Sequence, residues 1–204
     1  MTGVMDDNER IAAPERAEAQ VTRPLAQAVV IGIGGTGAQV VGRLNGAIRG
    51  GRVDQHAVDS VEMLLFDAAA DPVQQMELPP GSMLRPGVGV HTFDAFIPAG
   101  IVRQRLGADS HLTSWWDERH KLAMDPMEDG LRRDRMLGRL WFYHHSEQIR
   151  AAIAGAVTRA TRIDPALAAE VDPRSRAVLP VYIVCSTAGG TGSSGFLEVV
   201  AAVH

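Results

Sequence analysis

The chain has 204 residues, of which 46% are hydrophobic and 22% are charged, a composition typical of one globular domain with a sizeable core. The formal net charge of −4 gives no general attraction to nucleic acid or to an anionic membrane surface. The single cysteine excludes an internal disulfide framework, and no run approaches the roughly 18 apolar residues that a membrane span needs. We therefore expect a cytoplasmic protein that holds any bound anion by local geometry.

The N-terminal segment is polar and rich in Ala, Glu and Arg, without the apolar centre of a secretion signal. We interpret residues 1–24 as a disordered arm and residues 25–204 as one folded domain.

A first glycine-rich loop at 32–37 (GIGGTG) follows an apolar, strand-like run at 25–33 and opens a helical pattern over 36–48. Glycine lets the backbone approach a ligand closely, and a helix N-terminus directs free N–H groups and a positive dipole end at an anion. This order predicts a phosphate site. A second strand at 61–66 then predicts a parallel pair joined by a right-handed crossover, as in doubly wound α/β folds.

The middle of the chain is less regular. Prolines and glycines interrupt the pattern between residues 72 and 126, which indicates a large irregular insertion with a short strand within 88–96. We expect Trp115 and Trp116 to anchor part of it, because two adjacent indoles are rarely left in water. Apolar residues then recur at intervals of mostly three and four over 137–163, which predicts one long helix.

A second glycine-rich loop at 188–193 (AGGTGS) follows the apolar run 178–185 (VLPVYIVC). Such a run is typical of a strand that is buried on both faces of a parallel sheet. A bare turn does not need three glycines in four positions, so this loop also predicts a phosphate site. A final helix is expected from near Ser194.

The stretch 186–194 (STAGGTGSS) resembles the signature of the tubulin/FtsZ superfamily, and 61–71 (VEMLLFDAAAD) resembles its second strand and acidic turn. The segment 129–142 (DGLRRDRMLGRLWF) is similar to a motif of divergent bacterial tubulin-like proteins. The residues that carry this motif are Gly130, Arg135, Gly138, Arg139 and Leu140. The resemblance covers roughly residues 26–204 and implies a Rossmann-like, doubly wound parallel sheet with helices on both faces.

The resemblance also implies a function: binding of a guanine nucleotide, GTP or GDP with Mg²⁺, by a tubulin-like GTPase of a polymer-forming or assembly protein. In such proteins the nucleotide lies between stacked subunits, so head-to-tail self-association into a filament is implied. Relatives continue past the second loop with base-binding elements and a water-positioning acidic loop. We therefore expect a C-terminally incomplete domain that contains no catalytic residue and hydrolyses little by itself.

The candidate nucleotide-binding residues come from both loops, the second strand and the arginine motif. Glycine amides and the Thr191 hydroxyl would donate to phosphate oxygens, and Gln39 would lie one turn into the first helix. Asp67 would bind water-coordinated Mg²⁺ or the ribose, or would be an ordinary turn acid. Arg135 would reach a γ-phosphate or a neighbouring subunit, or would be a solvated surface arginine. The full set is Gly34, Gly35, Thr36, Gly37, Gln39, Asp67, Arg135, Gly189, Gly190, Thr191, Gly192 and Ser193.

Asp71 and Arg139 are further candidates for the roles of Asp67 and Arg135. His144 and His145 point about 100° apart on a helix and cannot chelate one metal in the i, i+4 manner. Cys185 is expected to be a buried thiol and not a nucleophile.

Two departures from the family pattern leave an alternative open. Ser194 stands where the signature ends in glycine, so its side chain would crowd a phosphate or donate to it, and Arg132 and Arg133 replace the usual Gly and Gln. These favour a tubulin-fold scaffold without nucleotide.

The other alternative is an NAD(P)-dependent oxidoreductase that uses 32–37 as its fingerprint. It requires an acid about 20 residues further on, whereas Asp67 follows Gly37 by 30, and it leaves the second loop unexplained.

Overall fold

The computed structural model describes residues 27–50, 61–68, 88–92, 107–116, 134–162 and 178–204, and the single residues 73, 76, 78, 104 and 131. The expectations for the arm at 1–24, for most of the insertion at 72–126, and for Asp71, Gly130, Arg132 and Arg133 lie outside the described residues. The helices and strands are β1 (Ala28–Ile33), α1 (Gly34–Arg49), β2 (Val61–Asp67), β3 (Val88–Thr92), α4 (Ser110–Trp115), α5 (Arg135–His144), α6 (Ser146–Ala160), β4 (Val181–Cys185) and α8 (Gly190–Val203).

The four described strands form one parallel sheet in the order β3-β2-β1-β4. The chain steps outward from β1 through β2 to β3 and then returns to β4 on the other side of β1. Ile33, at the end of β1, pairs in register with Phe66 of β2 and Cys185 of β4. The expected α/β class and doubly wound parallel sheet are confirmed.

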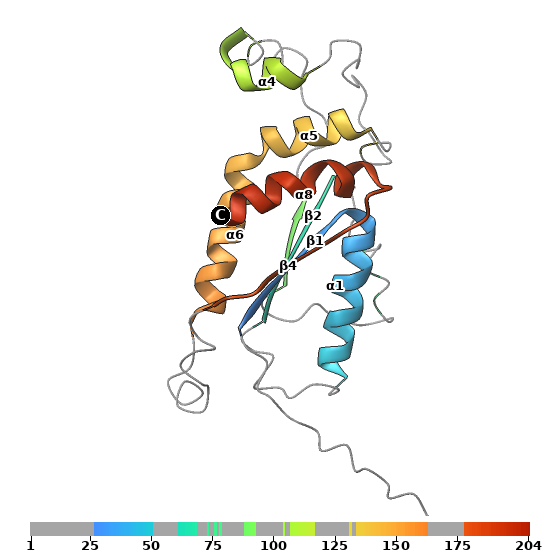
Figure 1. Cartoon of the computed structure of the whole chain (residues 1–204). Helices are drawn as coiled ribbons and strands as arrows, with labels where there is room; N and C mark the ends of the chain where they lie inside the picture. The colour runs from blue at the N-terminus through green and yellow to red at the C-terminus, as the bar shows by residue number, and fades with distance from the viewer. Residues whose placement is uncertain are drawn as a thin grey trace, which may run out of the picture.

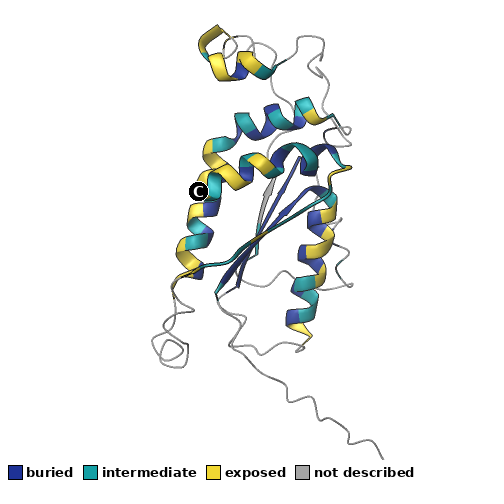
Figure 2. Cartoon of the chain, in the orientation of Figure 1, coloured by how far each residue is buried: buried dark blue, intermediate teal, exposed yellow. Residues whose placement is uncertain are grey.

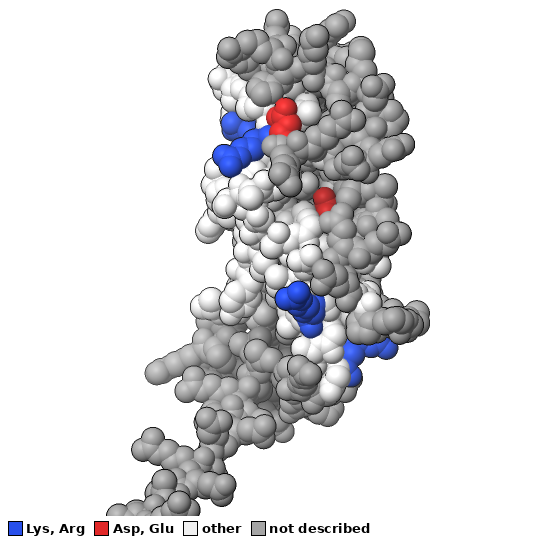
Figure 3. Space-filling model, turned by 90° about the vertical axis from the view of Figure 1, so that its right-hand side faces the viewer, with Lys and Arg blue, Asp and Glu red and all other residues white. Residues whose placement is uncertain are grey.

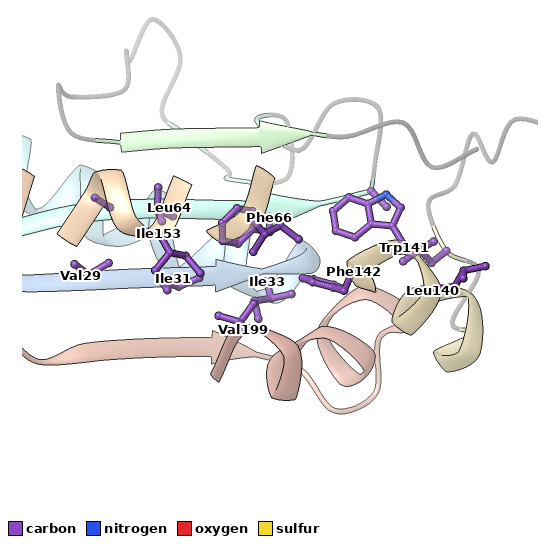
Figure 4. Close-up of a cluster of buried hydrophobic side chains, with 14 of the residues drawn as sticks. Val29, Ile31, Ile33, Leu64, Phe66, Leu140, Trp141, Phe142, Ile153 and Val199 are labelled. Atoms are coloured by element: carbon purple, nitrogen blue, oxygen red, sulfur yellow. The ribbon is translucent and has the colours of Figure 1, made fainter. Parts of the chain in front are cut away.

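Helices cover both faces of the sheet, as expected (Figure 1). Successive residues of a strand point to opposite faces, so β1 contributes to two cores. Val29, Ile31 and Ile33 pack in a cluster shared with α5, α6 and α8 (Figure 4). Ala28 and Val30 pack in a second cluster shared with α1. Every residue of β1 and β2 is buried (Figure 2), which explains their continuous apolar sequences.

The expectation of one helix over 137–163 is wrong, because two helices meet at His145. The backbone N–H of His145 donates to the Trp141 carbonyl at 3.0 Å, and its carbonyl accepts from the Ile149 N–H at 3.0 Å. Hydrogen bonding therefore continues while the chain changes direction, so that α5 lies along α8 and α6 covers β2 (Figure 1). Both helices turn their apolar sides to the same core, which is why the periodicity passes through the junction unbroken.

Strand β4 is not buried on both faces as expected, because it lies at the edge of the described sheet and Tyr182 is 57% exposed. The boundaries of β4 and α8 also differ from the sequence expectation. Strand β4 begins at Val181, since Pro180 has no N–H to donate to the sheet, although its carbonyl accepts from the Val29 N–H at 3.0 Å. Helix α8 begins at Gly190 and not near Ser194, so the glycines of the second loop form its first turn.

The described residues in the middle of the chain confirm two smaller expectations. The short strand is β3, parallel to β2. Trp115 and Trp116 are half-buried and pack against the cluster shared by β1, α5, α6 and α8. The centre of the Trp115 ring lies 6.4 Å from that of Tyr143 in an edge-on arrangement.

Within the described residues, no helix has the combined length and apolarity needed to cross a bilayer.

Candidate functional site

The two glycine loops leave the same edge of the sheet from adjacent strands. The last residues of β1 and β4, Ile33 and Cys185, are partners in the parallel register. Helix α1 then packs on one face of the sheet and α8 on the other. The strand order therefore reverses between β1 and β4, and open α/β sheets bind ligands at the carboxyl ends of the strands at such a switch point.

The loops touch each other at Gly34. This residue has a φ of 68°, in the left-handed region that favours glycine. A Cβ added to Gly34 would lie 3.3 Å from the Gly192 backbone nitrogen and 3.3 Å from the Thr191 Cβ. Two segments more than 150 residues apart in the sequence thus form one surface.

Two further glycines are required by packing. A Cβ at Gly37 would lie 2.6 Å from the Gly32 carbonyl carbon and 2.9 Å from the Val184 oxygen. A Cβ at Gly192 would lie 2.7 Å from the Ser186 oxygen. Their identity is explained by the close contact of each loop with the preceding strand, whether or not a ligand binds.

Gly189 is different, because the fold does not require a glycine there. Its φ of −86° and ψ of 156° are open to any residue, and an added Cβ would meet nothing within 4 Å. The missing side chain leaves the backbone approachable at the N-cap of α8.

The helices that begin at the loops, α1 and α8, have no side-chain cap hydrogen bond and no acid in the first turn. By contrast, the carboxylates of Asp109 and Asp134 cap α4 and α5, each accepting a hydrogen bond of 2.8 Å from the backbone. The first N–H groups of a helix have no partner within the helix, and an anion at α1 and α8 would not compete with a capping carboxylate.

Asp67, at the carboxyl end of β2, lies beneath the second loop. Its Oδ1 accepts a hydrogen bond from the Thr191 Oγ1 at 3.3 Å, and the two residues are 3% and 8% exposed. The expectation for Thr191 therefore changes in one respect: its hydroxyl proton is directed to Asp67 and not to a phosphate oxygen.

The residues present fit a magnesium ion. A carboxylate and a hydroxyl are the hard oxygen ligands that Mg²⁺ takes, and Mg²⁺ commonly uses one or two carboxylates together with phosphate oxygens and waters. No group of three or more His, Cys, Asp or Glu that could hold a metal occurs among the described residues. Any ion here would therefore depend on ligand oxygens as well.

The two arginines of the motif have different surroundings. The Arg135 Nη2 donates to the Thr187 carbonyl at 3.1 Å, which brings the start of α5 to the second loop. Arg139 instead lies 3.4 Å from Glu198 of α8 and stacks 4.3 Å from the centre of the Trp115 ring. The structure thus brings Arg135 to the candidate site and directs Arg139 to a helix contact.

The serines that follow Gly192 turn their hydroxyls back to their own helix. Ser193 donates to the Gly189 carbonyl, and Ser194 donates to the Gly190 carbonyl at 2.5 Å. Ser194 also packs against Gly138 of α5. Its side chain therefore faces α5, and the expectation that it would crowd or contact a phosphate has no support in this arrangement.

The first loop presents its polar side chains outward. Thr36 and Gln39 are exposed and Gly35 is half-buried. On the face drawn in Figure 3, the described basic side chains lie at separate positions and do not form one continuous patch. Backbone N–H groups are therefore the main anion-binding groups that the described loops offer.

The sequence reasoning missed Ser186 and Asp134. The Ser186 Oγ accepts from the Ala188 N–H at 3.2 Å at the start of the second loop. Asp134 caps α5 and so positions Arg135. An Asp directly before a helical pattern is a recognisable N-cap signal, whereas the role of Ser186 depends on loop geometry.

A protein-family model described as tubulin like matches residues 29–204. The chain belongs to the tubulin-like family. The match includes both glycine loops, Asp67 and the segment 129–142, so the expected membership of the tubulin superfamily is confirmed. No match was found among curated proteins or among solved structures.

Three side chains that the sequence analysis considered in this tubulin-like chain, those of His144, His145 and Cys185, do not contribute to the candidate site. The rings of His144 and His145 lie 4.8 Å apart at 81°, at the junction of α5 and α6. Cys185 is half-buried and packs against the main core, with its Cβ 3.2 Å from the position of a Cβ on Gly192. The Cys185 thiol is thus less buried than expected.

Proposed function

We propose that the chain binds a guanine nucleotide, GTP or GDP with Mg²⁺, through the two glycine loops at the carboxyl ends of β1 and β4. The observation that carries the proposal is the contact of the loops at Gly34, Thr191 and Gly192, which joins two uncapped helix N-termini into one anion-binding surface. Guanine is inferred from membership of the tubulin-like family alone.

Gly189 supports a ligand more directly than the other glycines. A side chain at Gly192 would meet Ser186, whereas no neighbour of Gly189 excludes a side chain there. In the proposed complex the bare backbone at 189 lets a phosphate oxygen approach the first N–H groups of α8. The same phosphates would contact residues 34–37, with Gln39 near the nucleotide and Arg135 at the γ-phosphate.

We include two wider features in the proposal. Residues 25–204 form one nucleotide-binding domain, and the nucleotide-bearing edge of the sheet is the surface through which copies of the protein associate head to tail. A heterologous contact of that kind gives an open polymer. Sedimentation velocity with and without GTP and Mg²⁺ tests this association. If the protein sediments as a monomer at all protein concentrations, with or without GTP, the proposed association is contradicted.

Isothermal titration calorimetry with GTP, GDP, ATP and NAD, each with Mg²⁺, tests nucleotide binding by the protein extended to the natural end of its gene, as wild type, Gly189→Ala and Gly46→Ala. Gly46 is the matched control, because its added Cβ also meets nothing within 4 Å but it lies inside α1, away from the loops. We expect selective GTP and GDP binding that Gly189→Ala weakens by about tenfold, a loss of about 1.4 kcal/mol.

The control also guards against a folding artefact. Gly46→Ala should leave binding unchanged and stabilise the protein by about 0.5–1 kcal/mol, since glycine is a poor helix former. Gly189→Ala should cost about 0.5–1 kcal/mol, because glycine is a better N-cap residue than alanine, and thermal melting of this variant shows whether it is still folded under the conditions of the titration. Absence of nucleotide binding by the wild type would favour the scaffold alternative. NAD binding that is indifferent to Gly189→Ala would favour an oxidoreductase.

A further inference from the structure

The hydrogen bond between Asp67 and Thr191 connects β2 to both glycine loops. Thr191 lies in the first turn of α8, and its Cβ is 3.3 Å from where a Cβ of Gly34 would be. Its Oγ1 lies 3.3 Å from the Asp67 Oδ1. A carboxylate at the end of one strand thereby controls a hydroxyl at the junction of the two loops.

The chemistry of the two groups fixes the direction of this bond. An ionised carboxylate only accepts hydrogen bonds, whereas a hydroxyl has one proton to donate and two lone pairs. Because the single proton of Thr191 is donated to Asp67, the threonine oxygen has only lone pairs left for anything else. A phosphate oxygen is also an acceptor and cannot bond to those lone pairs directly.

Burial of the carboxylate has a second consequence. Asp67 is only 3% exposed, and a buried charge is costly to retain unless it is paired or bonded. Beside bound phosphates, this negative charge would also be repelled in a medium of low dielectric constant. A divalent cation between the Asp67 carboxylate and the phosphates would reduce this repulsion, and the lone pairs of the Thr191 oxygen could coordinate it.

We propose that Asp67 is a positioning residue: its carboxylate accepts the hydrogen bond of the Thr191 hydroxyl, which leaves the Thr191 oxygen as an acceptor that contacts a nucleotide phosphate through a divalent cation and not by direct donation. The inference rests on the proposed nucleotide binding with Mg²⁺ and adds the roles of Asp67 and Thr191 toward that ion. It replaces the role first expected for Thr191, direct donation to a phosphate oxygen.

The test measures the affinity for GDP in Mg²⁺ and again in EDTA. The readout is the ratio of the two affinities, which we call the strengthening by Mg²⁺, and no enzymatic activity is needed. In the wild type, Mg²⁺ should strengthen GDP binding by about tenfold or more. In EDTA, Asp67→Asn should bind GDP about tenfold more tightly than the wild type. The charge that repels the phosphates is removed, and the asparagine amide can donate to the Thr191 oxygen. The Thr191 hydroxyl is then free to donate to a phosphate oxygen. The strengthening by Mg²⁺ in Asp67→Asn should fall to about twofold or less.

A second pair of variants covers the case in which Asp67→Asn fails to fold. Thr191→Val keeps the shape of the side chain and removes the hydroxyl, so it should lose most of the strengthening by Mg²⁺. Thr191→Ser should restore what Thr191→Val loses. Thermal melting of each variant without nucleotide separates folding from binding.

The outcomes separate this inference from the proposed function. Suppose that the wild type binds GDP and that Mg²⁺ strengthens GDP binding by the same factor in Asp67→Asn or Thr191→Val as in the wild type. This result would overturn the inference about Asp67 and Thr191 but would leave the proposed nucleotide binding intact. If the wild type binds neither GDP nor GTP, the proposed function fails and this inference fails with it.

Discussion

Gly138 of α5 faces Ser194 of α8 so closely that no methyl group fits between the two helices. A Cβ on Gly138 would lie 2.8 Å from the Ser194 Cβ and 2.8 Å from the Gly190 oxygen. The glycine of the arginine motif therefore packs α5 directly onto the first turn of the helix that begins at the second loop.

Replacing Gly138 with Ala should lower the free energy of unfolding by about 1–3 kcal/mol, the usual cost of overpacking. Urea unfolding measures this, with Gly46→Ala as the control in which an added methyl group meets open space. Equal stabilisation by both substitutions would show that the contact of α5 with α8 is looser than described.

Two of the ion pairs formed by the described residues should differ in strength. The Arg159 side chain is 49% exposed, but it lies 2.9 Å from Glu62, whose side chain is only 9% exposed. Arg139 and Glu198 lie 3.4 Å apart with side chains 36% and 34% exposed. Double-mutant cycles with Met at each position should give a coupling of about 1.5 kcal/mol for the Glu62 pair and about 0.2–1 kcal/mol for the Glu198 pair.

Salt provides a check on that order. In 1 M NaCl the coupling of the Glu198 pair should fall more than that of the Glu62 pair, because the Glu62 carboxylate is buried and is screened less than the half-exposed Glu198 carboxylate. If the coupling energy of the Glu198 pair is the same at low and high salt, the description of this pair as exposed is contradicted.

Arg135→Ala should weaken GTP binding by about tenfold, since hydrogen bonds to a charged group are worth about 1.5–3 kcal/mol. Its effect on GDP should be smaller if the guanidinium reaches the γ-phosphate. Because Arg135 is exposed, the stability should change by no more than about 0.5 kcal/mol. Arg150→Ala, an exposed arginine on α6, is the matched control and should leave binding unchanged in calorimetry.

Trp115→Ala should release α4 from the rest of the protein. The indole packs edge-on to Tyr143 and beneath the Arg139 guanidinium, and α4 has only six residues, too few to be stable without tertiary contacts. Hydrogen exchange should accelerate over residues 110–116 while α6 keeps its protection. Unchanged exchange at α4 would show that other contacts hold it.

Much of the architecture could be predicted because it depends on local pattern. The continuous apolar runs of β1 and β2 indicate strands buried on both faces, and the order of strands, glycine loops and helices indicates a doubly wound α/β fold. The tubulin-like family was suggested by the resemblance of 186–194 to its signature. The break at His145 could not be predicted, since α5 and α6 face the same core and their periodicity passes through the junction.

For the candidate site, the sequence by itself determined the residue types: two loops of glycines, each after a strand and before a helix, which are the requirements for backbone N–H groups to meet an anion. The tertiary structure decided which residues act together. It placed Asp67 against Thr191, brought Arg135 to Thr187 and turned Arg139 and Ser194 away to helix contacts. Local preference follows from neighbouring residues, but the direction of a side chain depends on which distant segment packs against it, and only the folded chain supplies that neighbour.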